Sequence, residues 1–161
     1  MPMATTHPIV KPSTYHVGQA GEYFVLAELH RRGANAVKFS GNLPSIDLIA
    51  IIPGKSQHIE IQVKTKRTGT WQTSIKHGTE GTADYRFWVL VDIGTDTTQP
   101  PKYYIIPDLW MRKHIVKQHK ANLAKHGGRR KETPESTHSA IKQQDVENDW
   151  HNRWDLLFAQ R

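Results

Sequence analysis

Two β-rich segments carry polar side chains of types that could bind a metal ion. Residues 44–52 hold Asp47 as their only acid, and residues 58–64 hold Gln62 and Lys64 two positions apart. Side chains two apart on a strand share one face, so Gln62 and Lys64 are expected to point the same way. Carboxylate and amide oxygens suit a hard divalent cation, and an ammonium beside it can orient a water molecule or stabilise a developing negative charge.

The sequence between the two segments predicts how these side chains meet. A proline-glycine pair marks a turn, and both flanking segments are rich in β-branched residues, so a hairpin is expected. If the turn centres on Gly54 and Lys55, the numbers of paired residues sum to about 109, which places Asp47 opposite Gln62. Glu60 faces the same way as Gln62 and is an alternative carboxylate for the site.

The order of these residues resembles the motif of the PD-(D/E)xK nucleases, an aspartate at the start of one strand and (Asp/Glu)-x-Lys on the next. Here the motif reads Ser45-Ile46-Asp47 and Gln62-Val63-Lys64. The glutamine departs from the commonest form, but a Gln-x-Lys version occurs in Mrr-like restriction nucleases and some homing endonucleases. Gly18-Gln19-Ala20-Gly21-Glu22 resembles the first helix of Holliday-junction resolvases, which supplies one more metal-facing carboxylate.

The resemblance spans residues 14–67 and implies both a fold and a chemistry. The implied fold is restriction-endonuclease-like α/β, with a mixed β-sheet flanked by helices. The implied activity is hydrolysis of DNA phosphodiester bonds by an Mg²⁺- or Mn²⁺-dependent endonuclease, and a homodimer is expected by analogy with nucleases that cut both strands. The implied catalytic residues are Glu22, Asp47, Gln62 and Lys64. The implied metal ligands are Asp47, Gln62, Glu22 and the backbone carbonyl of Val63.

The charge of the chain predicts a polyanionic partner. The 161 residues include 22 Lys and Arg against 15 Asp and Glu, a net charge of +7, and residues 111–131 contain no acid. Basic surfaces most often bind nucleic acid, through phosphates and whatever the base sequence. The alternative for this charge run is a solvated helix face. The expected nucleic-acid contacts are Lys66, Arg67, Arg112, Lys113, Lys117, Lys120, Arg129 and Arg130.

Several other classes of protein find no support in the sequence. There are no cysteines, which excludes thiolate metal sites and fits a reducing cytosol, so a cytoplasmic protein is expected. No apolar stretch is long enough to span a bilayer, and residues 1–12 lack the pattern of a signal peptide. His114 and His119 are five apart, which is not the spacing of two zinc ligands on one helix face. No glycine pattern of a nucleotide-binding loop occurs.

The expected elements form a nuclease-like α/β core over residues 13–107, after a flexible tail over 1–12. A helix is predicted over 14–32, with an apolar face at Val17, Ala20, Phe24 and Ala27 that Val25 and Leu29 widen. Glu28 is a second acid on this helix. Beyond the hairpin, residues 78–84 read as a loop. Further strands are predicted at 36–40, 70–75, 86–93 and 102–106. This order of helix and strands favours a mixed sheet.

A basic helical extension is expected over residues 108–161. A helix is predicted over 108–125, between Pro107 and the glycines at 127 and 128. Residues 132–147 are polar without an apolar period. The tail over 148–160 has Trp150 and Trp154 at helical spacing, and this helix is expected to pack back onto the core.

Two other functions remain open at the level of sequence. The first is a catalytically weak or inactive nucleic-acid-binding module on the same fold, in which Gln62 marks lost chemistry. The second is a protein-interaction or regulatory subunit that docks a partner through its C-terminal tryptophan helix.

Overall fold

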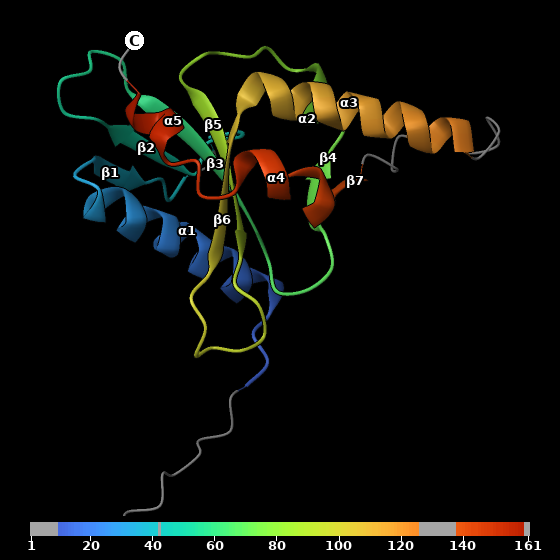
Figure 1. The fold of residues 1–161 in the computed structure, drawn as a ribbon, viewed down its shortest axis with the longest axis horizontal. Coiled ribbons are helices and arrows are strands. Elements are labelled where there is room, and N and C mark those ends of the chain that lie inside the picture. Colours follow the sequence, from blue (N-terminus) through green and yellow to red (C-terminus); the bar gives the residue numbers. More distant parts are fainter. Residues whose placement is uncertain (1–9, 42, 126–137, 160–161) are drawn as a thin grey trace, which may run out of the picture.

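A computed structural model of the protein describes residues 10–41, 43–125 and 138–159 (Figure 1). No helix in these parts of the chain is both long and apolar enough to cross a membrane. The elements, in chain order, are α1 (Thr14–Arg31), β1 (Asn35–Lys38), β2 (Leu48–Ile51), β3 (Ile59–Lys66), β4 (Trp71–Ser74), α2 (Lys76–Thr79), β5 (Arg86–Asp92), β6 (Lys102–Pro107), α3 (Asp108–Lys125), β7 (His138–Ile141), the 3-10 turn η1 (Gln143–Asp145), α4 (Glu147–Trp150) and α5 (Asp155–Phe158).

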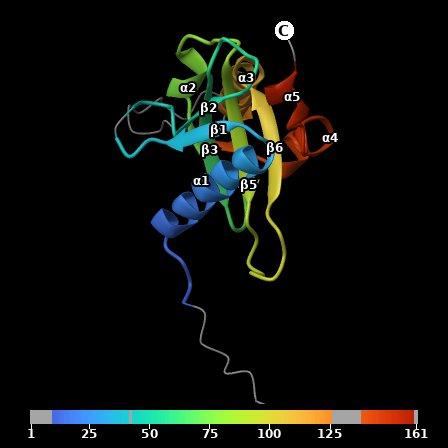
Figure 2. The same cartoon turned by 90° about the vertical axis from the view of Figure 1, so that its left-hand side faces the viewer.

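The centre of the fold is a five-stranded sheet with the strand order β1-β2-β3-β5-β6. β3 and β5 are parallel, and the other neighbouring pairs are antiparallel. Helix α1 lies on one face of the sheet, and α2 and α3 lie on the other (Figures 1 and 2). The expected α/β fold, a mixed sheet flanked by helices, is therefore confirmed.

The hairpin of β2 and β3 has the predicted register. Leu48 pairs with Ile61 and Ala50 pairs with Ile59, so the numbers of paired residues sum to 109. A shift of one residue would turn every side chain of a strand to the other face, so this register decides which side chains meet. Ile61 consequently faces α1, while Gln62 and Lys64 face α2 and α3.

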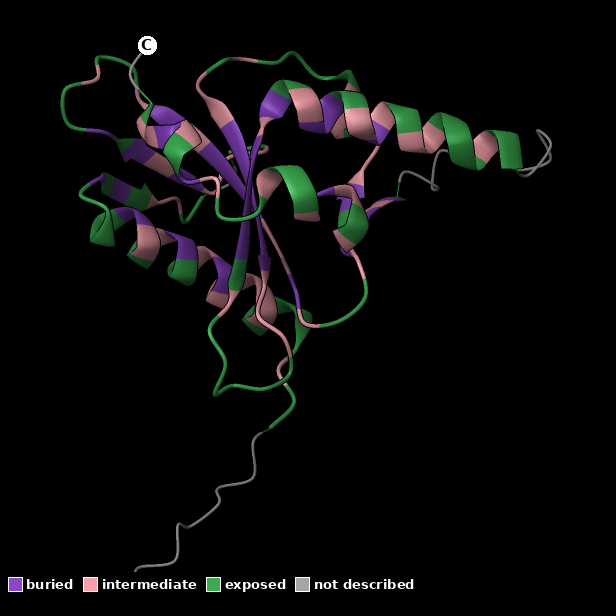
Figure 3. Cartoon of the chain, in the orientation of Figure 1, coloured by how far each residue is buried: buried purple, intermediate pink, exposed green. Residues whose placement is uncertain are grey.

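A separate apolar cluster fills each side of the sheet, shown as the purple residues of Figure 3. Val25 and Leu29 of α1 pack on the hairpin and on β5, and Trp154 and Leu157 from the C-terminal segment join this cluster. On the opposite side, the cluster contains Trp71, Trp88, Leu90, Tyr104, Ile106, Met111, Ile115, Ile141 and Val146. Both faces of β3 and β5 are thus covered, as is typical of parallel strands.

The face that α1 turns to the sheet includes Val25 and Leu29, as predicted, but it is not centred on the line through Phe24. The buried residues of the helix are Gly21, Val25 and Leu29, whereas Phe24 is 41% exposed. The reason is a close approach at Gly21, where an added Cβ atom would lie 1.8 Å from Oγ1 of Thr65. Hydrophobicity alone favoured Phe24, but the contact needs the smallest residue at its centre.

Three further expectations were wrong in the second half of the chain. The crossover from β3 to β5 contains β4 and the short helix α2, so the predicted loop over 78–84 begins inside a helix. The polar stretch over 132–147 contains β7, which pairs with β4 through Trp71 and Ile141. The single helix expected over 148–160 is two short helices, separated at Asn152 by a backbone φ of 53°.

The packing of α1 predicts opposite effects of alanine at its two glycines. Gly21→Ala should lower the free energy of unfolding by about 1–2 kcal/mol, because overpacking against Thr65 outweighs the gain in helix propensity. Gly18→Ala is the matched control, since nothing lies within 4 Å of its Cβ position, and it should raise stability by up to about 1 kcal/mol. Urea unfolding of both variants measures the difference. A stabilising Gly21→Ala would contradict the close contact.

Candidate active site

Asp47 is hydrogen-bonded to the two residues that flank Gln62 on β3. Its backbone N–H donates to the carbonyl of Ile61 (2.9 Å), and its Oδ2 atom accepts from the backbone N–H of Val63 (2.7 Å). The paired residues of the hairpin end at Leu48 and Ile61, so Asp47 directly precedes the paired part of β2. The pairing of Asp47 with Gln62 stays a prediction.

The amide of Gln62 is buried and incompletely bonded. The residue is 7% exposed, and its Oε1 atom has no hydrogen-bond partner among the described residues. A buried polar atom without a partner costs about 1–3 kcal/mol and calls for an explanation such as an ion or a water molecule. The N–H of Val63 already points toward Asp47, and the carbonyl of a strand residue points to the same side as its N–H. The oxygens of Asp47, Gln62 and Val63 therefore belong to neighbouring residues at one end of the hairpin.

Lys64 and the ring of His77 lie on the same face of the sheet as Gln62. The His77 ring packs edge-on against Trp88, the β5 neighbour of Gln62, with the ring centroids 5.3 Å apart. Burial lowers the pKa of His77 below its ordinary value, and the nearby charge of Lys64 lowers it further, against the opposite effect of Glu80. His77 is therefore neutral near pH 7 and stands beside the Lys64 ammonium.

Ser45 connects the start of the hairpin to α2. Its Oγ atom lies 3.2 Å from Nδ1 of His77 and donates to Oε2 of Glu80 (3.4 Å). Its backbone φ of 65° is unfavourable for a residue with a side chain. Such strain persists where the surroundings impose it, and it is common at functional sites. Sequence reasoning missed His77 and Glu80, whose only signal was a spacing of three residues in a segment read mostly as a loop.

A buried ion pair between Asp108 and Arg112 of α3 holds α2 next to Ser45. The Nε atom of Arg112 donates to Oδ2 of Asp108 (2.7 Å), and Trp88 donates to Oδ1 of the same carboxylate (2.7 Å). Arg112 also donates to the carbonyl of His77 and to Glu80. Although burial alone would raise the pKa of Glu80, the hydrogen bond from Arg112 leads the effects that hold it low. Arg112 is 4% exposed, so the expectation that it contacts phosphate is corrected to a structural role.

Lys66 is likewise a structural residue. Its ammonium donates to the carbonyl of Gly69 and to Oε1 of Gln143, both at 3.0 Å, and lies 4.1 Å from the centre of the Trp71 ring. Asp92 is 3.5 Å away, and Lys66 is 7% exposed. Gln143 and Asp92 lie far along the sequence from Lys66, so the local pattern gave no sign of these two contacts. A phosphate contact by Lys66 is excluded in this arrangement.

The remaining cations expected to contact nucleic acid lie at the surface, where the structure describes them. Lys113, Lys117 and Lys120, named here the α3 lysines, are exposed. No ion pair to them occurs within the described ranges. Arg67 is partly exposed. Arg129 and Arg130 lie outside the described residues.

The other acids considered for the site are engaged elsewhere. Glu22 pairs with Lys38 of β1 (2.9 Å), whose register places it on the face covered by α1, opposite Gln62. Glu60 accepts from Arg86 (2.6 Å), and Glu28 pairs with two arginines at the end of α1. Phe39, which follows Lys38, donates its N–H to the carbonyl of Asp47, and the role of Glu22 at the site stays a prediction.

The remaining oxygen donors suit a hard cation, and only one of them is charged. Among residues 10–41, 43–125 and 138–159, no group of three His, Cys, Asp or Glu residues could hold a metal ion. The Asp47 carboxylate, the Gln62 amide oxygen and the Val63 carbonyl are nevertheless all oxygen donors. Mg²⁺ is commonly held by one or two carboxylates, with water completing its shell. The residues present therefore fit such an ion, with a single negative charge among them.

Comparison with known proteins does not assign the chain to a family, so its function has to be argued from the site. No protein-family model matches the sequence, and no curated protein matches it. Among solved structures, the chain is similar to a bacterial homing endonuclease, I-Ssp6803I, with a TM-score of 0.42 and 22% sequence identity. The similarity covers 60% of this chain and 67% of that chain. A similarity of this size does not by itself assign a fold or an activity to this protein.

The proximity of Lys64 and His77 predicts a measurable change in the pKa of the imidazole. In metal-free buffer, NMR titration should give His77 a pKa below 6.5, and Lys64→Met should raise that pKa by removing a nearby positive charge. Lys102→Met, an exposed lysine on β6, is the charge-matched control and should leave it unchanged. Equal pKa values of His77 in all three proteins would show that Lys64 does not face the ring.

Proposed function

We propose that this protein is a metal-dependent endonuclease that hydrolyses phosphodiester bonds in DNA. The observation that carries the proposal is the unpartnered Oε1 atom of Gln62, buried beside Asp47 and followed on the same face by Lys64. A buried amide oxygen without a partner is costly unless a ligand completes it. An oxygen ligand set next to an ammonium suits phosphoryl transfer.

The residues that would hold Mg²⁺ or Mn²⁺ are Asp47, Gln62 and the carbonyl of Val63. Such an ion, when bound, makes a water molecule more acidic and neutralises charge on the scissile phosphate. The hydrogen bond from Val63 fixes one oxygen of Asp47 and so orients the other. Lys64 supplies a positive charge that can orient the attacking water or stabilise charge on the phosphate oxygens.

The α3 lysines and Arg67 are the proposed contacts to the DNA backbone. Of the nucleic-acid contacts expected from the sequence, these are the described residues that lie at the surface and have no described acidic partner. Lysine contacts to phosphate displace condensed counterions, so the affinity they provide falls with salt and does not depend on base sequence.

A nucleic-acid-binding module without catalysis is the second candidate. The observation that favours it is the single carboxylate left at the site, since no cluster of three acidic or histidine ligands occurs in the described parts of the chain. In that case the α3 lysines bind DNA, and Gln62 marks the loss of the metal. The two candidates differ in whether Mg²⁺ binds at Gln62.

Asp47→Asn is the sharpest test of hydrolysis. The asparagine keeps an oxygen that can accept from Val63, whereas alanine would also remove that hydrogen bond and cost about 1–3 kcal/mol of stability. Loss of the charge should reduce cleavage of plasmid and oligonucleotide DNA in Mg²⁺ by about a thousandfold or more, because a bound metal contributes several kcal/mol to phosphoryl transfer.

Asp96→Asn is the matched control, because Asp96 is a fully exposed acid on a loop away from the hairpin. The Asp96→Asn variant should cleave DNA at the same rate as the wild type. If Asp47→Asn cleaves as fast as Asp96→Asn, the endonuclease assignment is wrong.

Gln62→Glu separates the two candidates through metal-dependent stability. A buried second carboxylate beside Asp47 should lower the Tm in EDTA by like-charge repulsion, and Mg²⁺ should restore it through tighter binding. The rise in Tm on adding Mg²⁺ should therefore be larger in the variant than in the wild type. Gln72→Glu on β4, where the side chain is exposed, is the control. Equal Mg²⁺ effects in Gln62→Glu and Gln72→Glu would remove Gln62 from the metal site and favour the binding module.

A further inference from the structure

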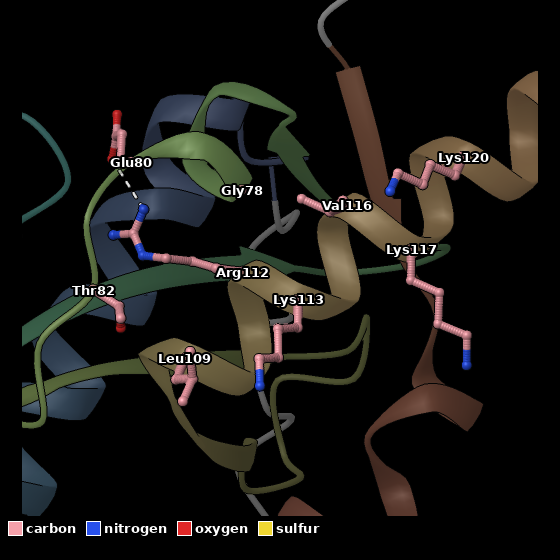
Figure 4. Close-up of a pocket in the computed structure, with 9 residues that line it drawn as sticks. All are labelled: Gly78, Glu80, Thr82, Leu109, Arg112, Lys113, Val116, Lys117 and Lys120. Carbon is pink, nitrogen blue, oxygen red and sulfur yellow. Dashed lines mark hydrogen bonds and ion pairs between the residues drawn. The ribbon is translucent and has the colours of Figure 1, made fainter.

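The face of α3 that looks toward α2 borders a cavity of about 500 Å³ (Figure 4). Its apolar wall comes from Leu109 and Val116, and the α3 lysines also line it. One end of the cavity is bounded by Gly78 of α2, which approaches α3 so closely that an added Cβ atom would lie 2.7 Å from Val116. The lining therefore combines an apolar surface with positive charge, and the only acid in it is Glu80, which Arg112 pairs.

The cavity adjoins the candidate active site through one residue. Oε2 of Glu80 lies 3.3 Å from Nη1 of Arg112 inside the cavity and 3.4 Å from Oγ of Ser45. Ser45 precedes Asp47 by two residues. The cavity therefore borders on the segment that carries Asp47.

The size and lining of the cavity select the kind of occupant. Cavities of roughly 300–1,000 Å³ bind small molecules or single groups of larger ones, so a paired duplex is too wide to enter. A nucleobase is flat and has an apolar face, which suits Leu109 and Val116. Its phosphate is an anion, which suits the α3 lysines. One nucleotide freed from its partner satisfies both requirements.

We propose that this cavity holds one unpaired nucleotide of the DNA substrate next to the cut. The preferred substrate is then DNA with a non-duplex element, such as a flap, an overhang or a branch, which is bound more tightly than a continuous duplex. This inference rests on the proposed function, because it takes the strand at Asp47 as its starting point. The half-exposed Leu109 is explained as a surface for the base.

The test compares the affinities for two DNA duplexes of equal length, one fully paired and one with a single-nucleotide flap. Fluorescence anisotropy in EDTA measures binding without cleavage. The wild type should bind the flap DNA about tenfold more tightly, as expected for burial of about 55 Å² of apolar base surface. Leu109→Ala should reduce this preference to about threefold or less, because it removes most of one apolar wall. Ile51→Ala is the control, since Ile51 is an aliphatic residue of similar exposure, 54% against 50%, outside the cavity.

Two results would overturn the proposal. The first is equal affinity of the wild type for flap and paired DNA. The second is the same flap preference in Leu109→Ala as in Ile51→Ala, which would place the preference elsewhere on the protein. Failure of the proposed function is distinguishable from both, because it appears as unchanged cleavage by Asp47→Asn in Mg²⁺ while the flap preference in EDTA persists.

Discussion

The buried ion pair of Asp108 and Arg112 determines where a site can form on this sheet. The carboxylate accepts from Arg112, Trp88 and Thr82, and the guanidinium reaches α2. Breaking a buried pair by removing one partner commonly costs about 3–5 kcal/mol, since a charge is left without compensation. The same contacts hold His77 over Trp88 and Glu80 against Ser45, so the geometry around Gln62 depends on a pair of residues outside the proposed metal ligands.

Two unusual features of the molecule lie at the start of the hairpin and on its second strand. Gln62 has a buried oxygen without a partner, and Ser45 has an unfavourable backbone conformation. Other described residues, such as Thr73 and Ser139, also have buried polar atoms without a partner. What distinguishes Gln62 is its place in the sequence motif with Asp47 and Lys64, near the strained Ser45.

The sequence predicted the features that depend on neighbouring residues, but not those that depend on contacts between distant elements. The turn at Gly54 and the alternation of β3 fixed the hairpin register, and Pro107 fixed the start of α3, because both signals are local. The burial of Arg112 and Lys66 could not be predicted, since it depends on contacts with His77 and Gln143 on other elements. Strand β7 was missed because its only cue is a four-residue alternation that depends on Trp71 for burial. The proposed roles of Asp47, Gln62 and Lys64 stay predictions.

A crystal structure of the protein saturated with Mn²⁺, phased to show the anomalous signal of the metal, would locate the ion directly. The proposed site predicts a peak bounded by Asp47, Gln62 and the Val63 carbonyl, with metal–oxygen distances of about 2.0–2.2 Å. A map with no peak at these three oxygens, or with the ion bound only elsewhere in the protein, would contradict a metal-dependent nuclease site at this position.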